Sequence, residues 1–230
     1  MSGENAGGTE GRMRKDEGRL ISFEGLDGAG KTTQMDLLER WLQAQAIHYV
    51  RTREPGGTAL GVELRHLLLE RPDLAITPLA EAFLFQADRA QHFATRVVPA
   101  LPEGKLVVTD RCFDASIAYQ GYARGVGPEL VERLSLLATS GIVPDLTILL
   151  DLDPSQVQHR TDIATDTGGQ RAERTRFDAE AEEFHARVQE GFRALARQHP
   201  ERIKVVDASR PVEEIHEEIV GLVKTIIAAE

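Results

Sequence analysis

Eight consecutive residues have the types and the spacing needed to bind a nucleoside triphosphate. They run from Gly25 to Thr32 and match the pattern G-x-x-x-x-G-K-[ST]. Glycines let backbone N–H groups wrap around phosphate, Lys31 can reach the β- and γ-phosphates, and the Thr32 hydroxyl is placed to hold Mg²⁺. The predicted phosphate-loop residues are Gly25, Leu26, Asp27, Gly28, Ala29, Gly30, Lys31, Thr32 and Thr33.

This motif does not by itself define a reaction. Switch GTPases, ATPases that drive motion and small-molecule kinases all share the loop. Guanine-specific switches commonly read their base with an Asn-Lys-x-Asp segment, whereas Asn5, near the start of the chain, is the sequence's only asparagine. The GTPase interpretation is therefore disfavoured, and a kinase should show a second pocket for its acceptor.

Residues suited to an acceptor pocket occur in three further segments. Thr52–Thr58 follows a predicted strand, and Arg65 comes next on a predicted helix. Phe85 and Arg89 are four residues apart and therefore share one face of a helix. The polar and aromatic segment Asp110–Gly121 follows another predicted strand. A motor or assembly ATPase has no need for such a pocket.

Apolar strands and helices alternate along the chain and would position these segments. The predicted strands are Leu20–Phe23, His48–Thr52, Leu106–Thr109, a run that ends with Ile148-Leu149-Leu150, and Ile203–Val206. Helical spacing is seen after the phosphate loop, at Leu60, Leu64, Leu67 and Leu68, over residues 79–100, and from Ile215 to Ile226. The pattern predicts an α/β fold with a five-stranded parallel sheet flanked by helices on both faces, in three layers. Ligands of such sheets bind at the carboxyl ends of the strands.

Composition limits the alternatives. The chain has 230 residues, is 41% hydrophobic and carries a formal charge of −10, so a broad basic face for nucleic acid is not expected. Its apolar runs are far shorter than the roughly 18 residues that span a membrane. With Cys112 as the only cysteine, no intrachain disulfide can form, which fits a reducing, cytoplasmic location. We expect a disordered tail over residues 1–18 and a single domain over 19–230.

In combination, these motifs resemble the bacterial thymidylate kinase family, whose members have the P-loop kinase fold and transfer the ATP γ-phosphate to dTMP, giving dTDP. The matching stretches are Phe23–Thr33, Thr52–Thr58, Leu84–Gln91, Asp110–Gly127 and Phe177–Phe192. The resemblance implies ATP and dTMP as small-molecule partners, Mg²⁺ as cofactor, a homodimer, and neither a nucleic-acid nor a membrane partner. A kinase for another nucleotide or for a deoxynucleoside is the nearest alternative, and a P-loop ATPase switch is more distant.

The resemblance also implies how dTMP would be read. Phe85 would stack on thymine, Arg89 would donate to the base carbonyl O4, and Ser116 and Gln120 would complete the polar reading of the base. Tyr119 would exclude a ribose 2′-hydroxyl. The alternatives are core packing for Phe85 and Tyr119, a surface ion pair with Asp88 or Glu81 for Arg89, and local backbone bonding for Ser116 and Gln120.

The remaining implied roles concern phosphate and metal. Arg65 and Arg111 would hold the acceptor phosphate, which a nucleoside lacks. Asp110 would be the acid near magnesium, together with Thr32, whereas Asp27 would lie near the acceptor 3′-hydroxyl and Glu54 would order the same corner.

A basic segment over residues 160–176, containing Gly168-Gly169, suggests a mobile lid. The resembled family places its catalytic arginine there when the phosphate loop contains none, as here. The family's Asp-Arg-apolar-Glu pattern is replaced by Thr175–Asp178, after a longer insertion. Which of the lid arginines reaches the γ-phosphate stays open. The predicted catalytic residues are Lys31, Asp27, Arg111, Arg176, Arg171 and Arg174.

Overall fold

A five-stranded sheet forms the centre of the molecule. The computed structural model describes residues 18–153, 156, 177 and 180–228. The strands are β1 (Leu20–Glu24), β2 (Tyr49–Arg53), β3 (Leu106–Asp110), β4 (Leu146–Asp151) and β5 (Ile203–Asp207). Every pairing is parallel, and the strand order is β2-β3-β1-β4-β5. The predicted parallel sheet is confirmed, and β1, which leads into the phosphate loop, is its central strand.

Helices connect the strands, as parallel pairing requires. They are α1 (Lys31–Ala44), α2 (Ala59–Glu70), α3 (Pro78–His92), α4 (Val98–Ala100), α5 (Phe113–Ser116), α6 (Pro128–Ala138), α8 (Glu182–Gln198) and α9 (Val212–Ile227). Two π-helical turns, Phe93–Val97 and Ile117–Ala123, extend α3 and α5. The helix predicted over residues 79–100 is thus present, with its π-helical turn just before Pro99, which has no N–H to donate.

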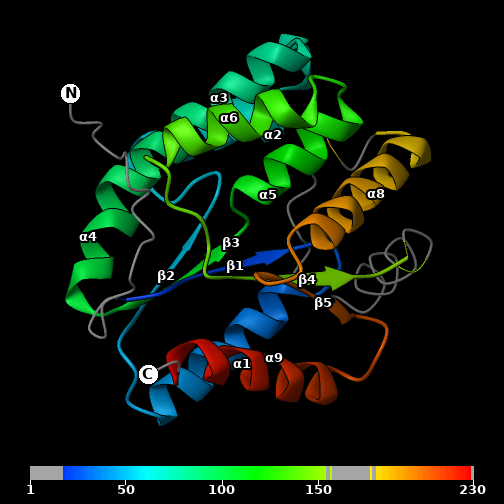
Figure 1. The fold of residues 1–230 in the computed structure, drawn as a ribbon. Helices are drawn as coiled ribbons and strands as arrows, with labels where there is room; N and C mark the ends of the chain where they lie inside the picture. Colours follow the sequence, from blue (N-terminus) through cyan, green and yellow to red (C-terminus); the bar gives the residue numbers. More distant parts are fainter. Residues whose placement is uncertain (1–17, 154–155, 157–176, 178–179, 229–230) are drawn as a thin grey trace, which may run out of the picture.

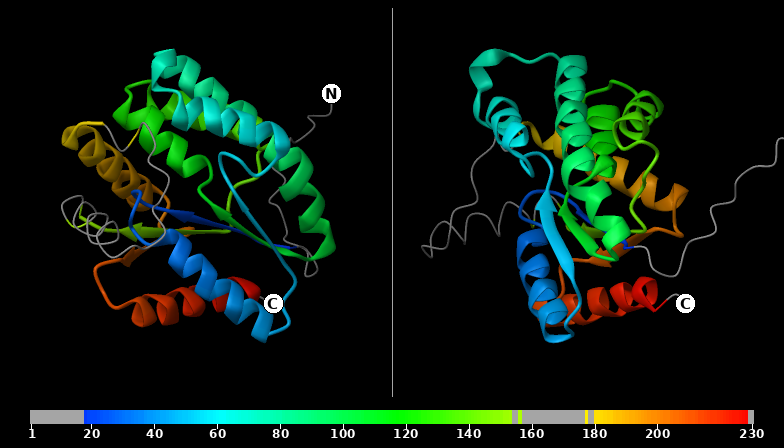
Figure 2. Two further views of the ribbon diagram at one scale, coloured as in Figure 1. Left: turned by 180° about the vertical axis from the view of Figure 1, so that it is seen from behind. Right: turned by 90° about the vertical axis from the view of Figure 1, so that its left-hand side faces the viewer.

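Two apolar layers cover the two faces of the sheet, because successive strand residues point to opposite sides. On one face, Ile21 and Phe23 pack against residues of α1 and α9 such as Leu38 and Ile219. On the other face, Leu20 and its neighbours pack beneath α3 to α8. Figure 1 shows α1 and α9 together below the sheet and the remaining helices above it, and Figure 2 shows the same layers from two further directions. The three-layer α/β architecture is therefore confirmed.

A buried ion pair fixes α5 over the sheet. Arg202, just before β5, donates to both carboxylate oxygens of Asp114 at 2.7 and 2.8 Å, and Thr147 of β4 donates to the same carboxylate at 3.0 Å. The Arg202 guanidinium also lies 5.0 Å from the centre of the Phe113 ring. These contacts join α5 to β4 and β5, so the start of the segment that follows β3 has a defined position.

The carboxyl ends of the strands gather the predicted site segments at one edge of the sheet. The phosphate loop follows β1, and the segments that begin at Glu54 and Arg111 follow β2 and β3. Residues 1–17 of the tail expected over 1–18, and the lid expected over 160–176, lie outside the described residues. Gly18 belongs to the described part, and its N–H donates to the Leu101 carbonyl oxygen at 2.7 Å. Within the described part, none of the helices combines the length and apolar character that crossing a membrane would require.

Candidate active site

The phosphate loop is a tight turn between β1 and α1, as the sequence predicts. Gly25 has a φ of +133°, and a Cβ added there would lie 2.5 Å from the Leu150 carbonyl oxygen of β4. Gly28 and Gly30 also have positive φ, at +85° and +100°, which favours glycine at both positions. The helix α1 begins at Lys31, so the free N–H groups of its first turn point into the loop. This arrangement can bind an anion.

Lys31 lies inside this loop and is held by it. Its Nζ donates to the carbonyl oxygens of Gly25 and Leu26, at 3.2 and 3.0 Å, and lies 3.7 Å from Asp27 Oδ1. Burial lowers the pKa of Lys31, and the nearby Arg111 charge acts in the same direction. A phosphate bound in the loop would add to the negative charge of Asp27 and favour the charged form of this ammonium.

Arg111 connects the phosphate loop to the rest of the cavity. Its Nη2 donates to Asp27 Oδ1 at 2.8 Å and to the Tyr119 hydroxyl at 3.2 Å. Its buried Nη1 has no hydrogen-bond acceptor among the described residues. Burial alone would lower the pKa of Arg111, but Tyr119 and Asp27 outweigh it and keep the guanidinium charged. An arginine with an unused donor beside a phosphate loop is suited to a second phosphate.

Asp27 is ionised beside these two cations. Desolvation in the cleft raises the pKa of its carboxyl, and the larger combined effect of Arg111 and Lys31 holds that pKa well below its usual value. At the neighbouring end of β3, Asp110 has one buried oxygen, Oδ1, that receives no hydrogen bond from the described part of the chain. Asp110 and Thr32 both line the same cavity. They are placed to act as oxygen ligands of Mg²⁺.

A buried network orders the corner formed by Glu54. Its two carboxylate oxygens pair with Arg89 Nε and His92 Nδ1, both at 2.8 Å, and His92 Nε2 lies 2.7 Å from Thr52 Oγ1. Burial raises the pKa of Glu54, but Arg89 and His92 lower it by more, so it stays ionised. The Glu54–Pro55 peptide bond in this loop is cis. The ion-pair partner of Arg89 is therefore Glu54, and the expected alternative of a surface pair with Asp88 or Glu81 is wrong.

Arg89 is only 1% exposed, and its donors are fully used by the protein. Besides Glu54, it donates through Nη1 to Gln86 at 2.9 Å and Ser135 at 3.2 Å, and through Nη2 to the Cys112 carbonyl at 3.1 Å and Ser116 at 3.0 Å. These contacts account for all five N–H groups of a guanidinium. The side chain lines the cavity, but a bond to a ligand would have to share one of these donors.

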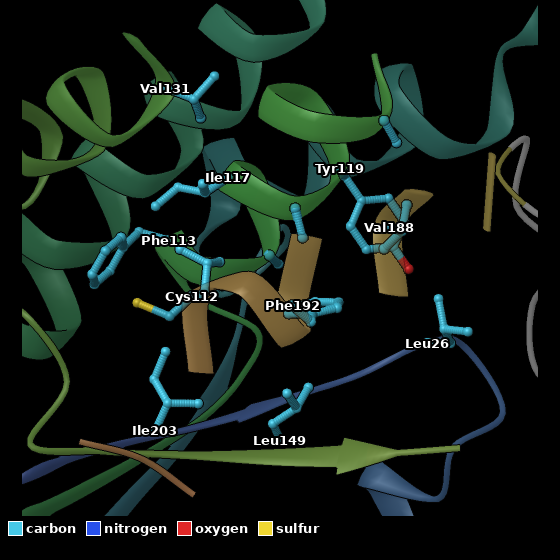
Figure 3. Packing of buried hydrophobic residues seen from close by; sticks show 14 of the residues in the cluster. Leu26, Cys112, Phe113, Ile117, Tyr119, Val131, Leu149, Val188, Phe192 and Ile203 are labelled. Carbon is cyan, nitrogen blue, oxygen red and sulfur yellow. The ribbon is translucent and has the colours of Figure 1, made fainter. Parts of the chain in front are cut away.

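Aromatic side chains form one wall of the cavity. Phe85 of α3 is partly buried and lies 6.4 Å, ring centre to ring centre, from Phe177. Tyr119 meets Phe177 edge-on at 5.5 Å and Phe192 of α8 at 6.2 Å, and Figure 3 shows its ring beside Val188 and Phe192. Tyr119 therefore belongs to the core through its ring, whereas its hydroxyl faces Arg111.

These parts enclose one cavity of about 500 Å³. Fifteen of the predicted residues line it: Asp27, Gly28, Gly30, Lys31, Thr32, Thr33, Glu54, Arg65, Phe85, Arg89, Asp110, Arg111, Ser116, Tyr119 and Gln120. Three loop residues, Gly25, Leu26 and Ala29, shape the turn without lining the cavity. The predicted lid arginines Arg171, Arg174 and Arg176 lie outside the described residues.

Sequence reasoning missed several residues of the site. Arg53 and Phe177 line the cavity, His92 holds Glu54, and Glu24 is fully buried beside the loop. Burial, and next the Asp114 carboxylate, raise the pKa of Glu24 to about 8. The sequence contains a signal for two of these residues. His92 is three residues after Arg89 and therefore on the same face of α3. Glu24 ends an apolar strand directly before the glycine-rich loop.

Comparisons with known proteins agree with this geometry. The family model described as Thymidylate kinase matches residues 23–219. A thymidylate kinase of Leifsonia xyli is 52% identical over 202 residues, which are 88% of this chain and 92% of that protein. One of Clostridium novyi is 40% identical over 208 residues, covering 90% and 99% of the two chains.

A solved structure extends the similarity to three dimensions. The crystal structure of thymidylate kinase from Ehrlichia chaffeensis matches with a TM-score of 0.70 at 33% identity, and the match covers 90% of this chain and 98% of that chain. The fold is thus shared over nearly the whole length of both proteins. Together with the match to the family model, this similarity means that the chain belongs to the thymidylate kinase family.

Proposed function

We propose that this chain is a nucleoside monophosphate kinase that transfers the γ-phosphoryl group of ATP to dTMP, giving dTDP and ADP. One observation carries the proposal. The same cavity is lined by the phosphate loop and by polar and aromatic side chains such as Phe85 and Gln120, and Arg111 joins Asp27 of the loop to Tyr119. Membership of the thymidylate kinase family supports dTMP as the acceptor.

The acceptor nucleotide lies along the cavity from Phe85 to Arg111. Phe85 stacks on thymine, and Ser116 and Gln120 contact the edge of the base. Arg89 donates to Ser116, and one of its N–H groups is shared between a protein acceptor and the thymine O4. Tyr119 excludes a 2′-hydroxyl because its ring is fixed by the aromatic wall. The acceptor phosphate binds Arg111 and Arg65. Asp27 and Glu54 hold in place the side chains around the sugar and this phosphate.

Thr32 and Asp110 would hold Mg²⁺ beside the ATP phosphates. The site suits the ion because the unused Asp110 oxygen is buried at the cavity wall and Mg²⁺ binds proteins through one or two oxygen ligands plus phosphate oxygens. When bound, the ion neutralises charge on the β- and γ-phosphates.

The protein contributes positioning and charge rather than a base. An acceptor phosphate oxygen is already anionic near neutral pH and attacks the γ-phosphorus in line. Lys31 and Arg111 stabilise the charge on the transferring group, and Arg111 keeps two polyanions together despite their repulsion. Stabilisation of the transferring group from its other side by Arg171, Arg174 or Arg176 stays a prediction.

The test is a coupled assay of ADP release with dTMP, dUMP, dCMP, thymidine, the TMP ribonucleotide or no acceptor. We expect the fastest release with dTMP. Faster release with thymidine would contradict the roles of Arg65 and Arg111 and favour a nucleoside kinase. Release that does not depend on an acceptor would favour an ATPase.

The active protein is proposed to be a homodimer. Six of the twelve large hydrophobic side chains that are exposed in the described part of the chain lie on three neighbouring helices, α2, α3 and α6: Leu60, Val62, Leu79, Phe83, Leu130 and Leu137. Figure 1 shows these helices side by side at the top of the molecule. Contact with a second copy would remove this apolar surface from water.

A further inference from the structure

The side-chain amide of Gln120 is held from behind by a buried carboxylate. Gln120 lines the cavity and is 1% exposed, and its Nε2 donates to Glu81 Oε1 at 2.7 Å. Glu81 lies in the first turn of α3 and is completely buried. The contact therefore joins a residue of the cavity wall to one that does not line the cavity.

This contact fixes which end of the amide faces the ligand. An ionised carboxylate only accepts hydrogen bonds, so it pairs with the NH₂ end of the amide and never with its carbonyl. The Arg124 guanidinium lies on the same carboxylate, with its Nε 3.4 Å from Glu81 Oε2. The carbonyl oxygen, Oε1, is then turned away from Glu81, and no residue of the described ranges donates a hydrogen bond to it.

Arg124 is itself well anchored. It pairs with Glu180 at 2.5 Å, and its guanidinium lies 4.5 Å from the centre of the Phe184 ring and 5.4 Å from that of Phe177. Glu81 is thus part of a packed cluster behind the aromatic wall and has little freedom to turn. Because the carboxylate cannot reorient, the Gln120 amide cannot flip.

From this geometry we propose that Glu81 is a positioning residue that sets the base specificity of the acceptor pocket by turning the Gln120 carbonyl toward the base. The inference rests on the proposed function. Thymine and uracil carry an N3–H donor that this carbonyl can accept, whereas cytosine presents a lone pair at N3, which repels it. Arg89 has only N–H donors and cannot accept the N3–H, whereas the Gln120 carbonyl can accept it and therefore provides the discrimination at N3.

The test is the variant Glu81→Gln, assayed with dTMP, dUMP and dCMP. A glutamine at position 81 can donate as well as accept, so the Gln120 amide is released to turn its NH₂ end toward the base. We expect the ratio of kcat/KM for dTMP over dCMP to fall about tenfold or more, the size expected when one buried hydrogen bond is lost. The ratio for dTMP over dUMP should not change, because both bases carry N3–H. A purely structural defect would lower all three activities together.

The matched control is Glu180→Gln. It removes the other carboxylate of Arg124 without touching Gln120, and we expect it to keep the wild-type ratio of dTMP to dCMP turnover. An unchanged ratio in Glu81→Gln, or an equal fall in Glu180→Gln, would overturn the inference.

A second variant keeps the test informative if Glu81→Gln does not fold. Glu81→Asp preserves the charge that pairs with Arg124 but shortens the reach to the Gln120 amide by one methylene. Its dTMP-to-dCMP ratio should fall in the same direction, and a wild-type ratio would count against the inference. Absence of dTMP turnover in the wild-type protein is a separate result, because it would overturn the proposed function before any variant is compared.

Discussion

Arg111 shows how a single residue is prepared for its role in the site. It has a positive φ of +66°, which is uncommon for a residue with a side chain, and its N–H donates to the Phe23 carbonyl oxygen at 2.9 Å. The backbone thereby turns directly after β3, and the guanidinium reaches Asp27 and Tyr119. Strain of this kind persists where surrounding contacts enforce it, commonly at functional sites.

The first prediction concerns this guanidinium. Arg111→Ala should lower kcat/KM for dTMP by about 10²–10³-fold, as expected when a preorganised group that stabilises the transition state is removed. Steady-state kinetics with dTMP varied at saturating ATP provides the measurement. Arg197→Ala is the matched control, since that arginine is exposed and, among the residues that the structure describes, pairs with the exposed Glu190 alone. Wild-type turnover in Arg111→Ala would show that Arg111 does not hold the acceptor phosphate.

The second prediction concerns Glu24, whose Oε1 accepts a hydrogen bond from Cys112 N at 2.7 Å. Burial raises the pKa of Glu24 to about 8 in the folded protein, well above the ordinary value of a glutamate. The folded state therefore keeps a proton that the unfolded chain loses, and the stability contributed by this group is lost as the pH rises toward 8. Glu24→Gln keeps the acceptor but does not titrate.

We expect Glu24→Gln to gain stability relative to the wild type as the pH rises from 5 to 8, and the gain to level off above pH 8. Each unit of pKa difference corresponds to about 1.4 kcal/mol, so the full effect should reach a few kcal/mol. Urea unfolding of both proteins between pH 5 and 9 measures it. A difference in unfolding free energy that does not vary with pH would mean that Glu24 is not protonated in the folded state.

Among the elements, the β1–loop–α1 unit depends most on close backbone approach. The loop passes so near to β4 that Gly25 has no room for a side chain. Gly25→Ala should therefore lower the melting temperature and abolish ATP-dependent turnover, because the loop must move to relieve the contact. Calorimetric melting and the coupled assay provide the two measurements.

Gly221→Ala is the control for that substitution. Gly221 lies within α9, where an added Cβ would meet nothing within 4 Å. Alanine at this helical position should stabilise the protein by about 0.5–1 kcal/mol. If Gly25→Ala retained wild-type stability and turnover, close packing of the loop against β4 would not be what fixes its shape.

The elements also explain what could be predicted from the sequence. The strands and the phosphate loop were predictable because their signals are local: apolar runs, and eight consecutive residues that carry one function. The network around Glu54 was not, since it joins residues 35 and 38 positions apart, and only the folded sheet brings β2 beside α3. The raised pKa of Glu24 likewise depends on its burial and on the Asp114 carboxylate of α5, which is distant in the chain, so it cannot be read from the sequence neighbours of Glu24.

At the scale of the whole molecule, positive side chains are concentrated in the cavity although the chain as a whole is acidic. The chain carries a net charge of −10, yet the cavity is lined by five cationic and three acidic side chains. Arginine supplies four of these five cations and contributes to a local field that suits two polyanionic substrates, whereas acidic residues dominate elsewhere.

The fourth prediction concerns assembly. Phe83 of α3 is 53% exposed, and if its helix forms the dimer contact, Phe83→Glu should convert a dimer into a monomer. Light scattering after size-exclusion chromatography measures the mass. Val205→Glu, at a 49% exposed position on β5, should stay dimeric. A wild-type protein that is monomeric at all concentrations would contradict the proposal.

The most direct test of the central claim is to follow the γ-phosphoryl group itself. The full-length protein is incubated with Mg²⁺, γ-³²P-labelled ATP and dTMP, and the products are separated by thin-layer chromatography. We expect the label to move to dTDP and Lys31→Ala to remove this transfer, because Lys31 is held in the phosphate loop between Gly25, Leu26 and Asp27. Label recovered as free phosphate, or transferred to thymidine in preference to dTMP, would contradict it.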